Sequence, residues 1–157
     1  MTQRYVELSA LSNFTFLEGA SHPDELVSTA AALGHEAVAI TDINTLAGIV
    51  RGHSAAKEAG ISYIVGARLR FQCGAPDLLC YPEDRAAYGR LCKLLTRGKR
   101  AAPKGECHLR LDDALEFGDG QLFALAPDAP DADILPALER LNNAFPGHVW
   151  LAAEPRF

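Results

Sequence analysis

Short, uniformly apolar runs alternate along the chain with longer segments in which apolar residues recur at helical spacing. The run at 37–40 is apolar throughout, a pattern typical of a strand that a parallel sheet buries on both faces. Just before it, Leu26, Ala30 and Leu33 recur at the period of an amphipathic helix. Strands are predicted at 5–10, 37–40, 62–65, 69–71, 78–81, 122–125 and 148–152, and helices at 23–33, 45–59, 134–145 and from Pro82 onward.

Cap and turn residues mark the ends of several of these elements. Ser21 is predicted to cap the helix that follows it, because a serine oxygen accepts from the free amides of a first helical turn. Pro23 suits the first helical position, and Gly34 and Gly60 are expected to end helices. An exposed loop is predicted at 98–105 and an acidic, turn-rich connection at 127–133.

Strands that alternate with helices of this length predict βαβ units, an α/β fold and a mainly parallel sheet with flanking helices. The sequence shows no repeat of fixed period and no linker-like segment, so a single domain over residues 1–157 is expected. A complete α/β barrel needs about 250 residues. We therefore expect a partial barrel, with the chain ending before the barrel closes.

Composition places the chain among ordinary globular proteins. It has 157 residues, a formal charge of −5, 48% hydrophobic and 22% charged residues. No apolar run approaches the roughly 20 residues of a membrane helix. The first residues lack the apolar core and cleavage site of a signal peptide, so no membrane association is expected and the cytoplasm is the expected location.

Cysteine and histidine spacing gives little support for a metal site. The four cysteines form no C-x-x-C pair, and the adjacent Cys107 and His108 have no second pair nearby. Lone thiols usually act as small buried apolar groups. His22, His35 and His53 show no ligand spacing with one another, so we expect them to cap helices or face solvent.

Basic residues concentrate in one stretch of an otherwise acidic chain. The overall balance argues against a dedicated nucleic-acid-binding protein. Within 90–110, however, cations outnumber acids. The stretch either lies near a DNA backbone or forms a solvated helix face, and we favour the second interpretation. The candidate DNA-backbone contacts are Lys93, Arg97, Lys99, Arg100 and Lys104.

Three loops that follow predicted strands carry a resemblance to a known family. They lie at 12–21, 41–48 and 66–68 and read SNFTFLEGAS, TDINTLAG and GAR. In this order and spacing they resemble the first three motifs of the polymerase-and-histidinol-phosphatase (PHP) domain. More narrowly, they resemble the N-terminus of bacterial C-family DNA polymerase III α subunits of the error-prone branch, which carry a helix similar to 81–95. The resemblance implies the N-terminal half of a PHP-type distorted (β/α)7 barrel.

The resemblance also implies a metal site, of which few ligands remain. Active PHP domains hold a trinuclear cluster of zinc, manganese or iron that hydrolyses phosphoesters. The family's His-x-His pair matches Ser9 and Leu11, the histidine of Thr-Asp-His matches Ile43, and a bridging glutamate matches Arg68. A further family histidine matches Asp77, and Glu18 and Asp42 are the carboxylates that remain.

We therefore expect no metal cofactor, with zinc or manganese only if the site proves functional. Asp42 is expected to cap a helix or order a turn. Arg68 either pairs with Asp42 or Glu18, or is a surface arginine on a strand edge.

The resemblance implies a structural scaffold without catalysis inside a DNA-directed DNA polymerase, a transferase of DNA replication and repair that extends DNA past lesions. The expected partners are the polymerase catalytic body of the same chain and DNA. Self-association through open sheet edges is also expected. Two alternatives stay open: a metal-dependent phosphoesterase or 3′–5′ proofreading exonuclease, and a nucleic-acid-binding module.

Overall fold

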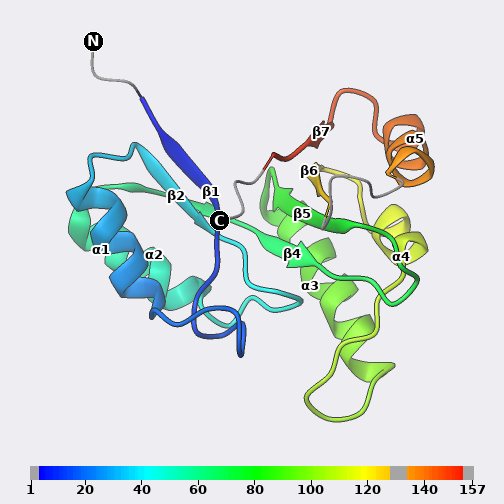
Figure 1. Cartoon of the computed structure of the whole chain (residues 1–157), viewed down its shortest axis with the longest axis horizontal. Coiled ribbons are helices and arrows are strands. Elements are labelled where there is room, and N and C mark those ends of the chain that lie inside the picture. The colour runs from blue at the N-terminus through cyan, green and yellow to red at the C-terminus, as the bar shows by residue number, and fades with distance from the viewer. Residues whose placement is uncertain (1–3, 128–133, 154–157) are drawn as a thin grey trace. The chain divides into compact units, whose positions relative to one another are not determined.

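The computed structural model describes residues 4–127 and 134–153, and the predicted connection at 127–133 lies almost wholly outside them. The chain divides into two compact units, with the boundary between Arg68 and Leu69. Figure 1 shows helices and strands in both units, as the alternating pattern predicts. The mixed α/β class with flanking helices is thereby confirmed.

The first unit is a parallel sheet of three strands with two helices packed against each other. The strand order is β1-β2-β3, and all pairs are parallel. The elements are β1 (Val6–Ala10), α1 (Pro23–Ala32), β2 (Ala37–Ile40), α2 (Ile49–Ala59) and β3 (Ser62–Val65). Every residue of β2 is buried, because this strand is central. Val27 and Ala30 of α1 and Ala56 of α2 form one core with Val38 and Ile40.

The second unit mixes strand directions. Its sheet has the order β4-β5-β6-β7, in which β6 pairs antiparallel with β5 and parallel with β7. The elements are β4 (Ala67–Leu69), which spans the boundary, β5 (Asp77–Pro82), α3 (Arg85–Arg100), α4 (Leu111–Glu116), β6 (Gln121–Ala126), α5 (Leu135–Ala144) and β7 (Val149–Leu151). Two sheets thus replace the single sheet of the prediction, and most strand pairs remain parallel.

Several element ends differ from the predicted ones for local reasons. His22, not Ser21, is the N-cap of α1, where its amide donates to Glu25 Oε2 over 2.8 Å. Helix α2 begins at Ile49 instead of Thr45. Helix α3 begins after Asp84, whose Oδ1 accepts from the Ala87 amide over 2.7 Å.

Pro82 is accordingly the last residue of β5 and not the start of a helix. Helix α3 extends to Arg100, so only the second half of the predicted loop at 98–105 lies outside the helix. Helix α4 has no counterpart among the predicted elements.

A buried glutamine joins α3 to the strands beside it. Gln121 is 1% exposed, and its Nε2 donates to the carbonyl of Ala87 over 2.7 Å. Cys80 Sγ in turn donates to Gln121 Oε1 over 3.3 Å, and burial raises the pKa of this thiol. The amide is therefore satisfied at both ends, as a buried polar group requires.

Among the residues that the structure describes, no helix has both the length and the apolar character needed to cross a membrane.

The two glycines of α3 provide a matched test of its packing. A Cβ at Gly98 would lie 2.6 Å from Cys107 Sγ and from Leu109 Cδ2, whereas one at Gly89 would meet no heavy atom within 4 Å. Gly98→Ala should lower the free energy of unfolding by about 1–3 kcal/mol through overpacking. Gly89→Ala should raise it by roughly 0.5–1 kcal/mol through helix propensity. Urea unfolding measures both, and changes of the same sign would contradict this packing.

Candidate functional site

Asp42 lies directly after β2, at the carboxyl end of the central strand, and is 2% exposed. Its Oδ1 accepts from the Ser12 amide over 2.8 Å and from Thr15 Oγ1 over 2.7 Å. Its Oδ2 accepts from Ser12 Oγ over 2.6 Å. All three donors belong to the connection between β1 and α1, residues 11–22, which we call the first loop.

The two hydroxyl groups also tie the backbone together. Thr15 Oγ1 accepts from the Ile43 amide over 3.0 Å, and Ser12 Oγ accepts from the Phe14 amide over 3.2 Å. Each hydroxyl thus donates its one proton to Asp42 and accepts from a main-chain amide, which uses its hydrogen-bonding capacity well. The result is a buried polar cluster of Ser12, Thr15 and Asp42, which we call the Asp42 cluster.

Close backbone approach around the Asp42 cluster requires glycine at one position and leaves little space at a second. A Cβ at Gly19 would lie 2.0 Å from the carbonyl oxygen of Ser12. A Cβ at Gly48 would lie 3.2 Å from Asp42 Oδ2. The Gly19 amide also donates to the carbonyl of Thr15 over 2.9 Å, which closes a tight turn in the first loop. These two glycines therefore let the loop and α2's start approach the carboxylate.

Tyr63 of β3 is a half-buried residue of the first unit whose hydroxyl oxygen is enclosed. Burial raises the pKa of Tyr63, and the negative charge of Asp42 raises it further. The tyrosine ring also fills the space beside Gly52, where a Cβ would lie 2.8 Å from the ring. The hydroxyl of Tyr63 therefore stays protonated at neutral pH.

The positions that match the family's metal ligands hold other side chains with other contacts. The Ser9 amide and Oγ lie 2.8 and 3.4 Å from Glu7 Oε1. Leu11 is half-buried and offers no ligand atom. Ile43, also half-buried, forms an isolated parallel bridge with Arg68. None of these three residues presents an imidazole or carboxylate to a metal.

Arg68 is buried, with 6% of its surface exposed, so the alternative of a surface arginine is wrong. Its amide donates to the carbonyl of Asp42 over 3.2 Å, and its carbonyl accepts from the Asn44 amide over 2.9 Å. These bonds place Arg68 beside the loop that follows β2. Pairing of its side chain with Asp42 or Glu18 stays a prediction.

The remaining carboxylates are not brought together as a ligand set. Glu18 is exposed on the first loop, whereas the carboxylate of Asp42 is buried and hydrogen-bonded. Asp77 lies 3.0 Å from Arg70 Nη2 in an ion pair. Within residues 4–127 and 134–153, no group of three or more His, Cys, Asp or Glu residues is placed to hold a metal ion. The donor set therefore does not fit a trinuclear cluster.

Histidines lie at a helix end and in local side-chain contacts, and of the cysteines Cys80 is buried whereas Cys73 is exposed. His22 caps α1, and its Nδ1 lies 2.8 Å from Asn13 Nδ2. His35 packs edge-on against Tyr5, with ring centroids 4.6 Å apart. His108 Nε2 lies 2.9 Å from Glu106 Oε2.

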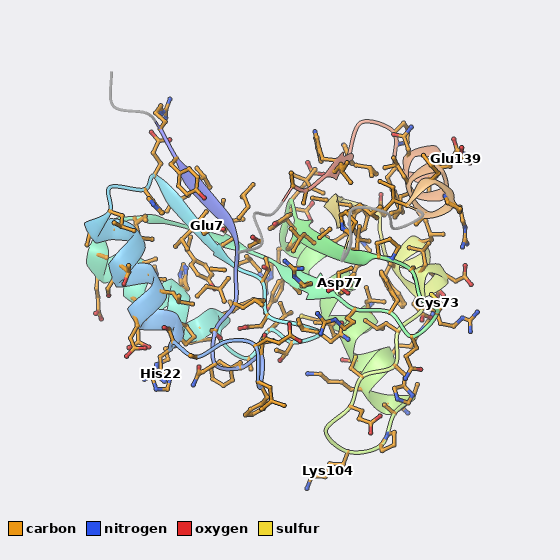
Figure 2. All side chains as sticks on the ribbon, in the orientation of Figure 1. Glu7, His22, Cys73, Asp77, Lys104 and Glu139 are labelled. Atoms are coloured by element: carbon orange, nitrogen blue, oxygen red, sulfur yellow. The ribbon has the colours of Figure 1, made fainter. Side chains whose placement is uncertain are left out.

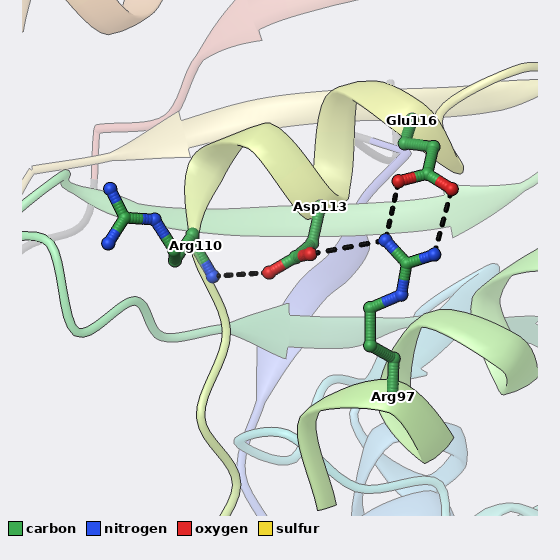
Figure 3. A network of polar contacts seen from close by, with 4 residues as sticks. All are labelled: Arg97, Arg110, Asp113 and Glu116. Carbon is green, nitrogen blue, oxygen red and sulfur yellow. Dashed lines mark hydrogen bonds and ion pairs between the residues drawn. The ribbon is translucent and has the colours of Figure 1, made fainter. Parts of the chain in front are cut away.

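Of the five candidate DNA contacts, Arg97 is already paired within the protein. Its guanidinium lies 2.8 Å from Glu116 Oε1 and 3.3 Å from Asp113 Oδ1 (Figure 3). It also lies 4.5 Å from the ring centroid of Phe117. Hydrogen bonding to Glu116 raises the pKa of Arg97, and the same bond lowers the pKa of Glu116.

The other four candidate contacts are exposed: Lys93, Lys99, Arg100 and Lys104. Figure 2 shows Lys104 on the loop that follows α3, with its side chain directed into solvent. The structure thus separates one internally paired cation from four that face water.

Sequence reasoning missed Ser12 and Thr15 as partners of Asp42. Both residues lie in a segment that carries the family resemblance, and both bear a hydroxyl. In a loop, however, serine and threonine are equally typical of local turns. Only the fold shows that their hydroxyls meet a carboxylate 27 to 30 residues further along the chain.

Parallel strands alternate with helices in the first unit, and polar residues lie at the carboxyl ends of these strands. This arrangement is typical of α/β domains that carry their functional site at that edge of the sheet. The family model of the PHP domain matches residues 7–144. The chain therefore belongs to the PHP domain family. The resemblance seen in the loop motifs is thereby confirmed.

The chain is similar to part of much longer proteins. Error-prone DNA polymerases of Brucella abortus and Caulobacter vibrioides are each 50% identical to it. The matches cover 94% and 95% of this chain and 14% of each relative. The chain thus corresponds to about one seventh of these polymerases.

Two solved structures share the fold. An amidohydrolase from Chromobacterium violaceum superposes with a TM-score of 0.71 at 16% identity, over 93% of this chain and 75% of that one. A protein from Bifidobacterium adolescentis, assigned as a metal-dependent phosphoesterase, gives 0.69 at 13% identity, over 94% and 76%. At these identities the likeness shows the fold alone.

The hydrogen bonds of the Asp42 cluster predict that the free energy of unfolding depends strongly on the hydroxyl of Thr15. Thr15→Val keeps the shape of the side chain but leaves Asp42 Oδ1 and the Ile43 amide each without one partner. We expect the free energy of unfolding to fall by about 1–3 kcal/mol. Thr15→Ser retains the hydroxyl and should cost about 1 kcal/mol or less. Urea unfolding measures both variants, and equal losses would show that the methyl group, not the hydroxyl, matters.

Proposed function

We propose that residues 1–157 form a single, partial PHP domain that acts as a structural module without catalysis in an error-prone type of DNA polymerase. The observation that supports this most is the state of Asp42. Both carboxylate oxygens of this buried motif residue accept hydrogen bonds from Ser12 or Thr15. Asp42 therefore orders the first loop, and this role needs no metal ion.

The chemistry of the vestigial positions supports the same proposal. Phosphoester hydrolysis by a metal cluster needs imidazole and carboxylate ligands that hold the ions and activate water. Leu11 and Ile43 cannot coordinate a metal, and the Ser9 hydroxyl is a weak neutral ligand. Arg68 brings a permanent positive charge to a position where cations would gather. No metal cofactor is therefore proposed.

The relatives supply the context for the whole protein. Because the matched polymerases share half of their aligned residues with this chain, we place it in a protein that copies DNA past lesions during repair. Its partners would be the polymerase body of the same polypeptide and, through it, DNA. The cytoplasm is its proposed location. Tested alone, the chain would present unpaired sheet edges, which favour self-association.

A second candidate function is a metal-dependent phosphoesterase or 3′–5′ exonuclease. It is favoured by one observation, the fold shared with the Bifidobacterium adolescentis protein. Fold alone does not define a reaction, and the residues present here do not make the ligand set. Zinc or manganese would enter only under this alternative.

Metal content tests the proposal directly. The purified chain is incubated with zinc and manganese, desalted, and analysed by mass spectrometry. We expect less than about a tenth of an equivalent of either metal, because only one exposed and one hydrogen-bonded carboxylate remain. One equivalent that disappears on Glu18→Ala or Asp42→Asn, together with hydrolysis of a phosphodiester, would favour the phosphoesterase alternative.

A restored site provides the positive control. A variant combining Ser9→His, Leu11→His, Ile43→His and Arg68→Glu returns the family's ligands to their positions and should bind about one equivalent or more. A matched variant carries the same residue types at exposed positions: Ser28→His, Leu33→His, Val50→His and Arg85→Glu. It should bind no more than the unmodified chain. Equal binding by both variants would contradict the assignment of the vestigial positions.

A further inference from the structure

Helix α3 carries a stripe of cations along one face. Arg90, Lys93, Arg97 and Arg100 are spaced by three, four and three residues, so they lie above one another on the helix, and we call them the α3 stripe. The helix has six basic and no acidic residues among its 16 positions. The chain as a whole has 20 acidic and 15 basic residues, so the composition of α3 is unlike that of the chain.

Two members of the α3 stripe are explained by the fold. Arg90 donates from Nε to the carbonyl of Asp119 over 2.7 Å, and its Nη2 lies 3.4 Å from Asp119 Oδ2. Arg97 is held by Glu116 and Asp113. These two arginines therefore fasten α3 to the residues around α4.

The other two members are not explained by the fold. Lys93 and Arg100 are exposed, and no carboxylate partner is recorded for either within the part of the chain that the structure describes. Arg100 lies in the last turn, where a cation favours the negative end of the helix dipole. Lys93 lies near the middle of α3, where this effect has faded. Like charges three and four residues apart also repel one another, so Lys93 does not stabilise the helix.

Lys93 and Arg100 line an open groove on this face of α3. Its other lining residues are Cys92, Thr96, Arg97 and Ala101. Along α3, Arg97 lies between the two cations, and its guanidinium is held by Asp113 and Glu116. The remaining lining side chains are small or neutral. The groove therefore presents two separate positive charges on one helix, and none of its lining residues is acidic.

The two charges lie far enough apart to contact different phosphates of a DNA backbone. Seven residues of helix advance about 10.5 Å. Three base steps of one strand in duplex DNA advance about 10.2 Å along the duplex axis, so a stretch of this length offers several phosphates. The long, flexible side chains of Lys93 and Arg100 can each reach a different one of them. A small anion such as free phosphate would engage only one of the two charges.

We propose that the groove of α3 binds the phosphate backbone of duplex DNA through Lys93 and Arg100. Arg97 is a wall of this site and not a phosphate ligand, because its guanidinium is already occupied by Glu116. Lys99 lies on a different face of the helix, and with Lys104 it adds to the positive field that attracts the polyanion. The choice of DNA among polyanions rests on the proposed function.

Fluorescence anisotropy with a labelled 15-base-pair duplex tests the proposal on the 157-residue chain, with a chelator present. Lys93→Gln combined with Arg100→Gln should raise the Kd at least fivefold. It should also make the slope of log K against log salt shallower by about 1.8, which corresponds to two lost phosphate contacts. Lys57→Gln combined with Arg85→Gln removes the same charge at other exposed positions and should change the Kd less than twofold.

Three further measurements make each outcome decisive. Arg97→Gln should lower the melting temperature and leave the salt slope unchanged, which separates the wall from the ligands. A duplex RNA of the same sequence, or polyglutamate as competitor, should bind the groove more weakly than DNA does. Stronger binding of either one, no binding of DNA, or equal losses in both double variants would overturn the proposal.

Failure of this proposal and failure of the proposed function are distinguishable. Metal content tests the vestigial positions of the first unit, whereas DNA binding is measured with metals chelated. Circular dichroism of every variant shows whether it is folded, and a variant that unfolds is replaced by the corresponding Lys93→Ala or Arg100→Ala single variant. A chain that binds metal but still needs Lys93 and Arg100 for DNA would overturn only the scaffold assignment.

Discussion

The first unit depends on how the charge of Asp42 is compensated. A carboxylate that loses contact with water costs several kcal/mol unless hydrogen bonds replace the lost hydration. Here Ser12 and Thr15 supply these bonds, and both belong to one loop. The buried charge therefore fixes the first loop to the end of β2. Gly19 and Gly48 follow from the same constraint, because any side chain at either position would crowd this contact.

Compensation by neutral donors explains how the ligand positions could change without damage to the fold. In a metal site, clustered carboxylates repel one another and need cations between them. Of the two carboxylates that the motifs retain, Asp42 is buried and Glu18 is exposed. A single carboxylate needs only a few well-placed donors, which two hydroxyls and one amide provide. Leu11 and Ile43, in place of imidazoles, bring no further charge to this region.

Sequence patterns predicted those features that local periodicity encodes. Strand β2 was predicted with its observed bounds, because a strand buried on both faces is apolar at every position. The antiparallel pairing of β5 with β6 was not predicted, since an apolar run carries no information on strand direction. Helix α4 is too short for its period to stand out. The Asp42 cluster joins residues far apart in sequence, and no local pattern contains that contact.

The exposed residues of α3 are not those that would make the helix most stable. A glutamate at Gly89, four residues before Lys93, would add an attraction of about 0.2–0.5 kcal/mol. It would also remove a glycine that costs a helix interior roughly 0.5–1 kcal/mol relative to alanine, and nothing nearby obstructs a side chain there. The acids Asp119 and Glu116 are paired with Arg90 and Arg97. The positive field of Lys93 and Arg100 is thereby left open to an anion from outside.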